Sequence, residues 1–555
     1  MMTYVLLDLI FAAIGAVLYA VLRARCGDGV VWVVARRFAL ATAIASAGGA
    51  LQATPMAPGD ALASGLVLLF VGSLLMLIVH RIRGLLPSAD HGEAASGRGS
   101  HMRGARLVSG RALAGRLKKE AGALTIGAQK IPTRLEPLHF LIAGATGTGK
   151  SVAISEVLDG ISARGDRAFI SDAAGGYLSR YYSEPRGDIV LNPLDSRAVS
   201  WSPLAEISSP WDAEQFAKSI IPTGTGSAHE WNTYAQAVVA VILKRAWENH
   251  LTNADIFRLA IIADLDELRL VFSGTPAAPL VAEGNERMFG SVRGIVGTYL
   301  APYQYLDPAA GVDSFSLKKA VRDNKAGWMF FNFADDQLTM LAPIISAVTD
   351  IISKALLSMN PDENRKFWLI LDEFASLGRV SSIIDFLTKA RKFGGRAIIG
   401  IQTVAQLRSA YGQADAATLL SNTGSQLVLR VPDPETADIM SRMLGDEQVL
   451  RTMGSSGKSS GGMQMIGTNS ENQSEQIVNE RIIMPSQLQN LETLHGIINL
   501  AGGFPAAPVE LEPRERSITA PAFTATTRKS PTVSIQKPAV DNIDLPLDLD
   551  TPQSE

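Results

Sequence analysis

Cysteine is almost absent from this sequence, since Cys26 is the single one among 555 residues. One cysteine cannot form an internal disulfide, and it cannot build a Cys-rich zinc site. The seven histidines are scattered without the spacing of metal ligands, so we predict no structural metal. The chain also lacks an excess of charge of one sign, because its formal net charge is -3. A polyanionic partner would therefore have to bind local basic patches.

The N-terminal region lacks the features of a removable signal peptide, because it has no basic start and a second long apolar run follows the first. Residues 3–22 and 61–79 are each long enough to cross the ~30 Å hydrocarbon core of a bilayer as a helix, and Asp8 is the one charge in them. Residues 38–52 are apolar but Ala-rich and short, which makes them a marginal third span. We interpret residues 1–86 as a membrane anchor of two or three transmembrane helices.

Arginines decide the predicted topology of this anchor. They flank the apolar runs in two groups, one after the first run and one after the last: Arg23, Arg25, Arg36 and Arg37, then Arg81 and Arg83. The positive-inside rule puts both groups in the cytoplasm, which requires three crossings and an outside N-terminus. With two crossings the first group would face outward, so we favour three. Everything after Arg83 is predicted to be cytoplasmic with either two or three crossings. The alternative to a membrane anchor is that these apolar runs form a buried hairpin inside a soluble protein.

Beyond the anchor, the small polar residues at 87–104 predict a linker. From residue 105 onward, short apolar runs rich in branched and aromatic residues alternate with helical stretches. Runs of this kind suit strands that are buried on both faces of a parallel sheet. In chain order they read HFLIAG, RAFIS, GWMFFNF, KFWLILD, RAIIGIQ, SQLVLRV and GIINLAG. We predict an α/β domain made of residues 105–195 and 326–512.

The α/β alternation stops between residues 196 and 325, which we predict to be an inserted all-α domain. Apolar residues recur there at helical spacing, as in Trp231, Tyr234, Val238 and Ile242. Residues 513–555 are rich in Pro, Thr and Ser and end in acidic residues, so they are predicted to be a disordered tail. Residues 454–476 are polar and rich in Gly and Ser, which predicts a mobile loop within the folded domain.

The stretch GATGTGKS matches the phosphate-binding P-loop pattern G-x-x-x-x-G-K-[ST], and it follows the strand HFLIAG. Glycines let the backbone N–H groups of such a loop surround a phosphate at the positive end of the next helix. The predicted nucleotide-binding residues are Gly144, Ala145, Thr146, Gly147, Thr148, Gly149, Lys150 and Ser151. Lys150 should reach the β- and γ-phosphates, and the Ser151 hydroxyl should ligate Mg²⁺.

A P-loop needs a metal-holding acid and a base before it can hydrolyse a nucleotide. The stretch FWLILDEFASLG supplies both, because Asp372 and Glu373 follow an apolar strand. Asp372 is predicted to orient Mg²⁺ through its water shell, and Glu373 is predicted to polarise the attacking water. The alternative is a solvated loop or a helix cap. The acid pair argues against a small GTPase switch, in which a glutamine positions the water.

Two further residues are candidates for the same chemistry. Gln402 ends the strand RAIIGIQ, where its side chain could sense the γ-phosphate, although it could also face solvent. Arg391 lies in LTKARKFGGRA, a basic stretch that also holds Lys389, Lys392 and Arg396. Arg391 could be an arginine finger that reaches the nucleotide of a neighbouring subunit, or part of a solvated or DNA-facing patch.

The motifs of this chain, taken in order, resemble those of the conjugative coupling proteins of type IV secretion systems, the TraD and TrwB type. The matching pieces follow the N-terminal apolar runs and span residues 100 to 510. They are RGARLVS, GATGTGKS, GDRAFISD, DIVLNPLD, WSPLAEI, LILDEFASL, LTKARKFGG, GIQTVAQL and RIIMPSQL. P-loop and acid motifs alone are generic, but the ordered set is specific.

This resemblance implies an ATPase of the bacterial inner membrane with its ATPase domain in the cytoplasm. Its fold would be a RecA-like nucleotide domain with an all-α domain, assembled as a hexameric ring. ATP and Mg²⁺ are the implied cofactors, and DNA would stimulate hydrolysis. The implied partners are single-stranded transfer DNA held without sequence specificity, the relaxase and accessory relaxosome proteins, and inner-membrane components of the secretion system. The family's motifs would make Lys150, Ser151, Asp372, Glu373, Gln402 and Arg391 the ATPase residues.

Three points stay open from the sequence. The family usually has two membrane helices with an inward N-terminus, whereas the arginines here favour three. The residues that line a DNA path are not evident, and Lys458 and Lys392 are candidates. Two other functions compete: a DNA translocase of the FtsK kind, and a scaffold or receptor for protein substrates that uses the nucleotide as a switch. The FtsK kind usually has more spans, a long linker and a C-terminal DNA-reading domain.

Overall fold

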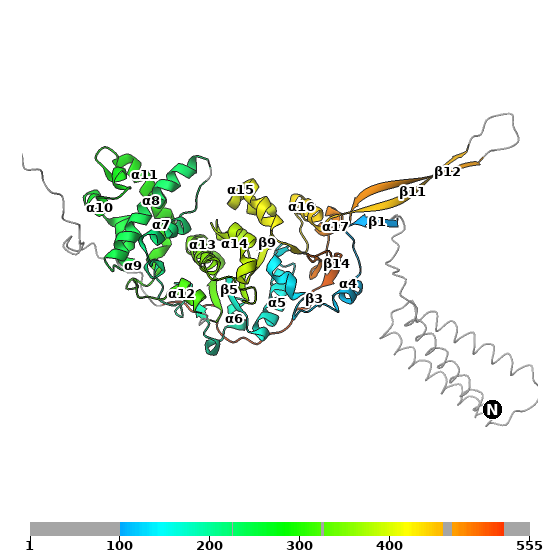
Figure 1. The fold of residues 1–555 in the computed structure, drawn as a ribbon, viewed down its shortest axis with the longest axis horizontal. Helices are drawn as coiled ribbons and strands as arrows, with labels where there is room; N and C mark the ends of the chain where they lie inside the picture. The colour runs from blue at the N-terminus through cyan, green and yellow to red at the C-terminus, as the bar shows by residue number, and fades with distance from the viewer. Residues whose placement is uncertain (1–99, 225, 324–326, 459–468, 527–555) are drawn as a thin grey trace, which may run out of the picture. The chain divides into compact units, whose positions relative to one another are not determined.

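The computed structural model describes residues 100–526 except 225, 324–326 and 459–468 (Figure 1). The predicted membrane anchor at 1–86, the predicted linker up to residue 99 and the end of the predicted tail from residue 527 lie outside the described residues. Within the described part, one helix is long and apolar enough to cross a membrane, α13 (Asp335–Leu357). Most of its apolar stretch is buried inside the protein.

The centre of the described chain is a nine-stranded sheet with the strand order β14-β13-β10-β4-β9-β8-β5-β7-β6. The seven strands from β10 to β6 are parallel to their neighbours, and β13 and β14 extend the sheet antiparallel at one edge. The strands are β4 (Phe140–Ala143), β5 (Arg167–Ala173), β6 (Ile189–Val190), β7 (Met329–Phe333), β8 (Phe367–Leu371), β9 (Gly395–Ile401), β10 (Ser425–Val428), β13 (His495–Asn499) and β14 (Ala507–Glu510). Each of the seven predicted apolar runs overlaps one of these strands.

Both faces of the sheet are buried, which explains why its strands read as continuous apolar runs. Successive residues of β8 alternate between two hydrophobic clusters, as the period of two requires. Trp368 and Ile370 pack with Val157 of α5 (Lys150–Arg164), whereas Leu369 and Leu371 pack in the cluster that contains Ile345 of α13. The helices that complete this region are α4 (Gly110–Leu117), α6 (Leu178–Tyr181), α14 (Ile383–Lys389), α15 (Val404–Ser421), α16 (Pro434–Leu444) and α17 (Pro485–Gln489).

Helices make up the segment between β6 and β7, where an all-α insertion was predicted. They are α7 (Pro210–Ile220), α8 (Ser227–Glu248), α9 (Asn253–Phe257), α10 (Leu265–Phe272), α11 (Glu286–Leu300) and α12 (Leu317–Arg322). The predicted stripe lies on α8, and its later residues Val238 and Ile242 are buried. Trp231, at the start of the stripe, is 37% exposed, so the stripe covers the core only in part.

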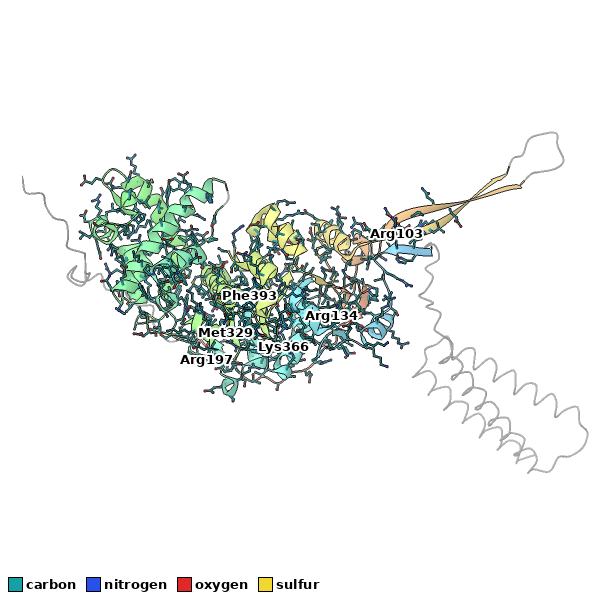
Figure 2. All side chains as sticks on the ribbon, viewed as in Figure 1. Arg103, Arg134, Arg197, Met329, Lys366 and Phe393 are labelled. Carbon is teal, nitrogen blue, oxygen red and sulfur yellow. The ribbon has the colours of Figure 1, made fainter. Side chains whose placement is uncertain are left out.

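The polar segment at 454–476 differs from its prediction as a mobile loop. It belongs largely to two paired antiparallel strands, β11 (Asp446–Lys458) and β12 (Asn469–Arg481). The strand β1 (Ser100–Gly104), which carries Arg103, pairs with the base of this hairpin (Figure 2). Main-chain hydrogen bonds hold such a hairpin together whatever its side chains are. Alternation of apolar and polar residues, by which strands over a core are predicted, is therefore not required here. A second hairpin joins β2 (Leu124–Ile126) and β3 (Gln129–Ile131).

The segment 513–526 also differs from the prediction of a disordered tail. Residues 516–526, which we call the C-terminal strap, bind to the α/β region mainly through their backbone. The N–H of Thr519 donates to the carbonyl of Ser179 at 2.8 Å, and the N–H of Ser196 donates to the carbonyl of Thr524 at 2.8 Å. Main-chain contacts of this kind leave no mark on composition, so a low apolar content did not reveal them.

Arg396 does not belong to the predicted basic surface stretch. It is 2% exposed, and its Nε donates to Glu136 Oε2 at 2.9 Å. Arg164 donates to the same fully buried carboxylate at 2.7 Å. A buried charge is tolerated when it is paired and hydrogen-bonded, as this carboxylate is. The charge of Arg396 is therefore used inside the protein, whereas Arg391 and Lys392 are exposed.

Candidate functional site

The loop GATGTGKS connects the end of β4 to the start of α5 at the carboxyl edge of the sheet. Gly147 has φ +74°, and a side chain added there would meet no atom within 4 Å, so this turn needs glycine and faces open space. Gly149, the N-cap of α5, has φ +116° and makes no side-chain cap hydrogen bond. The first N–H groups of a helix have no partner within the helix. This loop therefore offers uncapped N–H groups to an anion.

Lys150 lies folded back over the loop. It is 6% exposed, and its Nζ donates to the carbonyl of Gly144 at 2.8 Å and to that of Ala145 at 3.4 Å. Among the residues that the structure describes, no carboxylate forms an ion pair with it. A nearly buried cation without a carboxylate partner favours an anionic ligand. The lysine and the uncapped helix thus fit the phosphates of a nucleotide.

Asp372 lies beside the P-loop, although the two are far apart in the sequence. The sheet order β4-β9-β8 brings the carboxyl end of β8 close to that of β4. As a result, Ser151 Oγ donates to Asp372 Oδ2 at 3.4 Å across 221 residues of chain. Asp372 is 5% exposed. A hydroxyl and a carboxylate facing each other beside a phosphate loop are the donor set that Mg²⁺ takes with a nucleotide.

Glu373 is held in an unusual backbone conformation next to the same loop. Its φ of +60° and ψ of +38° are left-handed, a conformation that costs a non-glycine residue about 1–3 kcal/mol and is typical of functional sites. Gln402 Nε2, at the end of β9, donates to both carboxylate oxygens of Glu373 at 2.7 Å. Thr146 Oγ1 donates to Gln402 Oε1 at 3.4 Å. A chain of contacts thus joins the P-loop through Gln402 to Glu373.

Arg391 is not brought to this site within one chain. It lies in the turn at residues 390–393, which precedes the amino end of β9, whereas Gln402 follows the carboxyl end. The seven residues of β9 separate the two edges of the sheet by roughly 20 Å. Arg391 is exposed, so it could contact a nucleotide only if a neighbouring subunit presented one to it. Its proposed role as an arginine finger stays a prediction.

Two residues of the site were missed by sequence reasoning. Asp172, at the end of β5, is fully buried and accepts hydrogen bonds from the N–H groups of Tyr177 and Leu178 at 3.1 and 2.6 Å. Burial, with a smaller contribution from the charge of Asp372, raises the pKa of Asp172 to about 7. Tyr177 donates its hydroxyl to Asp372 Oδ2 at 2.7 Å. Asp372 was predicted because an acid follows an apolar strand. The same pattern could have predicted Asp172, but it could not have predicted Tyr177.

No cluster of three or more His, Cys, Asp or Glu side chains is suited to a metal within the described part of the chain. This is compatible with Mg²⁺, which keeps several waters and is bound by one or two protein ligands together with phosphates.

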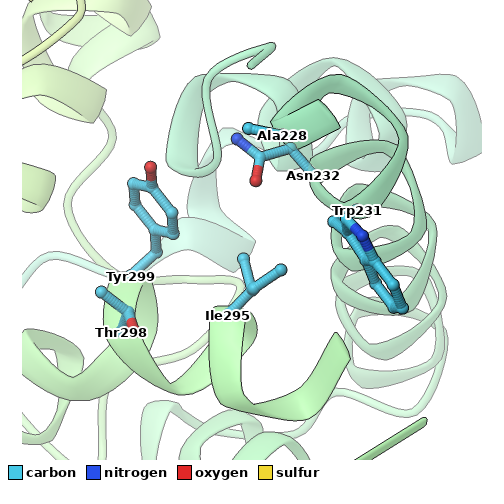
Figure 3. Close-up of a pocket in the computed structure, with 6 residues that line it drawn as sticks. All are labelled: Ala228, Trp231, Asn232, Ile295, Thr298 and Tyr299. Carbon is cyan, nitrogen blue, oxygen red and sulfur yellow. The ribbon is translucent and has the colours of Figure 1, made fainter. Parts of the chain in front are cut away.

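A pocket of about 380 Å³ lies far along the chain from the P-loop, in the helical region (Figure 3). Residues of α8 and α11 line it: Ala228, Trp231, Asn232, Ile295, Thr298 and Tyr299. None of these side chains is a cation that could hold a phosphate. The phosphate chemistry therefore belongs to the P-loop and not to this pocket.

A comparison with known protein families identifies the family of this chain. The family model of the type IV secretion-system coupling protein DNA-binding domain matches residues 123–512, more than half of the chain. The chain belongs to the type IV secretion-system coupling proteins. The resemblance stated from the motifs is thereby confirmed.

Individual relatives agree with this family. This coupling protein is 29% identical to the coupling protein TraD of Escherichia coli K12 over 416 residues, which are 73% of this chain and 57% of TraD. It is 28% identical to VirD4 of Agrobacterium fabrum over 162 residues, 28% of this chain and 24% of VirD4. The chain thus spans little more than half of TraD.

Solved structures of the coupling protein TrwB are similar throughout the described fold. The unbound form of TrwBdeltaN70 is 33% identical, with a TM-score of 0.70, and the match covers 78% of this chain and 98% of that one. TrwB in complex with the non-hydrolysable ATP analogue ADPNP is 32% identical, with a TM-score of 0.70, and the match covers 78% of this chain and 99% of that one. These matches confirm the α/β P-loop fold with a helical domain.

Proposed function

We propose that this coupling protein is a membrane-anchored ATPase that couples the relaxase–DNA complex to a type IV secretion channel. ATP hydrolysis would drive the conjugative transfer of the DNA strand. The observation that carries this proposal is the approach of Ser151 to Asp372 at 3.4 Å, because it joins a phosphate loop to a metal-facing acid. TrwB has been solved with the ATP analogue ADPNP and with ADP and Mg²⁺, which supports ATP and Mg²⁺ as the ligands of this chain.

The proposed roles follow from the contacts of each side chain. The uncapped N–H groups at the start of α5, residues 149–151, bind phosphate oxygens, and Lys150 exchanges its carbonyl partners for the β- and γ-phosphates. Ser151 and Asp372 hold Mg²⁺, which when bound neutralises charge on the phosphates. Glu373 accepts a proton from the attacking water, and Gln402 holds the Glu373 carboxylate in place. Arg391 acts on the nucleotide of the next subunit.

The surroundings of this ATPase are part of the same proposal. The apolar runs at the N-terminus anchor it in the bacterial inner membrane, with the ATPase domain in the cytoplasm. A homohexameric ring gives Arg391 a neighbouring site, and it lets lysines and arginines bind the phosphates of single-stranded DNA without reading its sequence. The relaxase, the relaxosome proteins and the inner-membrane components of the secretion system are the protein partners.

The dependence of hydrolysis on DNA tests this function. We expect ATP hydrolysis by the full-length protein to rise several-fold with single-stranded DNA, equally for two unrelated sequences, and the rise to weaken at higher salt because phosphate contacts release counterions. The measurement is steady-state phosphate release with and without each DNA. Hydrolysis indifferent to DNA would favour a receptor for protein substrates, and a preference for duplex DNA of one sequence would favour an FtsK-like translocase.

The role of Asp372 can be tested by a substitution at Gly400, which contacts the Asp372 carboxylate. A Cβ added at Gly400, in β9, would lie 2.9 Å from Asp372 Oδ1. We expect Gly400→Ala to lower kcat about 10- to 100-fold, because it displaces the metal-facing acid, while nucleotide affinity is retained. Gly290→Ala is the control, since a side chain at this exposed position meets nothing within 4 Å. An unchanged kcat in Gly400→Ala would contradict the role of Asp372.

A further inference from the structure

The hydroxyl of Tyr177 makes the shortest of the hydrogen bonds to the Asp372 carboxylate. It donates to Oδ2 at 2.7 Å, whereas Ser151 Oγ donates to the same oxygen at 3.4 Å and the N–H of Glu373 donates to Oδ1 at 3.1 Å. Burial, followed by the charge of Asp372, raises the pKa of Tyr177 well above its ordinary value, so the hydroxyl keeps the proton that it donates. Tyr177 is 4% exposed and belongs neither to the P-loop nor to the acid pair.

Residues 174–179, which we call the Tyr177 turn, comprise a turn and the start of α6. Asp172 holds this segment from the inside of the protein. Both oxygens of this fully buried carboxylate accept backbone N–H groups of the turn, from Tyr177 at 3.1 Å and from Leu178 at 2.6 Å. The ring of Tyr177 packs in the hydrophobic cluster that contains Ile154 and Val157 of α5. The backbone and the ring are therefore both held, and the hydroxyl has a defined position.

The same turn is covered from the outside by the C-terminal strap. The N–H groups of Thr519 and Ala520 donate to the carbonyl of Ser179 at 2.8 and 3.2 Å. The carbonyl of Ala522 lies so close to Gly175 that a Cβ there would be 2.4 Å away. Because the backbone of the strap lies directly against the turn, the turn cannot shift outward while the strap is bound.

Both ends of the strap are fastened to other elements. Arg516 donates to both oxygens of Asp159 in α5, at 2.9 and 2.6 Å. Asn332 Nδ2, in β7, donates to the carbonyl of Ala522 at 2.8 Å, and the N–H of Thr526 donates to the carbonyl of Leu194 at 2.9 Å. The strap thus bridges α5, β7 and the segment after β6, with the Tyr177 turn between them.

We propose that Tyr177 is a positioning residue that fixes Asp372 for the metal of the bound nucleotide, and that the C-terminal strap holds the turn that carries Tyr177. This inference rests on the proposed ATPase function and adds a part of the chain outside the P-loop and acid motifs. A carboxylate that faces a metal depends on the groups that bind its other lone pairs, and loss of such a group typically lowers metal affinity about 10- to 100-fold. Release of the strap would free the Tyr177 turn and would therefore also lower the affinity for the metal, although the strap does not contact the metal itself.

Metal binding without turnover tests the first part of the proposal. The affinity of Mn²⁺ for the full-length protein saturated with ADPNP is measured by electron paramagnetic resonance. We expect Tyr177→Phe to lower this affinity about 10-fold and to leave the affinity for metal-free nucleotide unchanged. Tyr411→Phe is the matched control, because the Tyr411 hydroxyl is also buried and accepts the N–H of Val380 at 3.0 Å, away from the P-loop. It should reduce stability without changing the affinity for Mn²⁺.

Two truncated chains test the strap. A chain that ends at Pro513 lacks the strap and should bind Mn²⁺ as weakly as Tyr177→Phe, whereas a chain that ends at Thr526 keeps it and should bind as the wild type does. Wild-type affinity in Tyr177→Phe, or an equal loss in Tyr411→Phe, would overturn the role of Tyr177. Equal affinity in the two truncated chains would overturn the role of the strap. A wild-type protein that binds neither ADPNP nor Mn²⁺ would instead refute the proposed function itself, and this inference with it.

Discussion

Glu373→Gln is expected to bind ATP as the wild type does and to hydrolyse it about 10²- to 10⁴-fold more slowly. The amide has the shape of the carboxylate and can still contact Gln402, whose Nε2 lies 2.7 Å from both Glu373 oxygens. It cannot take a proton from water, so it removes the base and leaves the binding site in place. Equilibrium binding of ADPNP and single-turnover hydrolysis of ATP measure the two properties separately.

Glu363→Gln is the control for this change. It removes the same charge from an exposed loop at the amino end of β8, whereas Glu373 follows the carboxyl end. We expect its turnover to equal that of the wild type. If Glu373→Gln retained most of the hydrolysis rate, the base would have to be another group, and the left-handed conformation of Glu373 would have no catalytic explanation.

The second large effect is expected at Lys150. Lys150→Ala removes the cation that lies 2.8 Å from the Gly144 carbonyl over the phosphate loop. Hydrogen bonds to charged groups contribute about 1.5–3 kcal/mol, so the affinity for ATP should fall about 10- to 100-fold. Isothermal titration with ADPNP and Mg²⁺ measures this loss.

Lys366→Ala controls for the loss of a lysine. Lys366 immediately precedes β8, at the amino edge of the sheet, and Figure 2 marks its side chain. Its removal should leave the affinity for ADPNP unchanged. Wild-type affinity in Lys150→Ala would mean that the nucleotide binds elsewhere, and the proposed site would be wrong.

Local patterns were sufficient to predict seven of the nine strands of the sheet and the centre of the site, but they did not predict β6, β14 or the antiparallel pairing of β13. The P-loop is a contiguous stretch, and Asp372 and Glu373 directly follow a run that is apolar because β8 is buried on both faces. The P-loop and the two acids meet because the carboxyl ends of parallel strands lie at the same edge of a sheet. The structure brings Ser151 and Asp372 together at this edge.

Contacts between distant segments were not evident from the sequence. Tyr177 reaches Asp372 across 195 residues, and the strap reaches the Tyr177 turn through main-chain groups that any sequence possesses. Arg396 looked like a surface cation because it stands among other basic residues, but its partner Glu136 lies 260 residues away. The β11–β12 hairpin was missed because its polar residues carry no apolar alternation.

Conjugative transfer by cells that carry Lys150→Ala tests the central claim most directly, since it links the nucleotide site to DNA movement. A donor strain whose own copy of the gene is deleted is complemented with the wild type, Lys150→Ala or Lys366→Ala, each at equal protein level. We expect normal transfer with Lys366→Ala and a loss of transfer of several orders of magnitude with Lys150→Ala. Transfer at the wild-type frequency with Lys150→Ala would contradict the central claim.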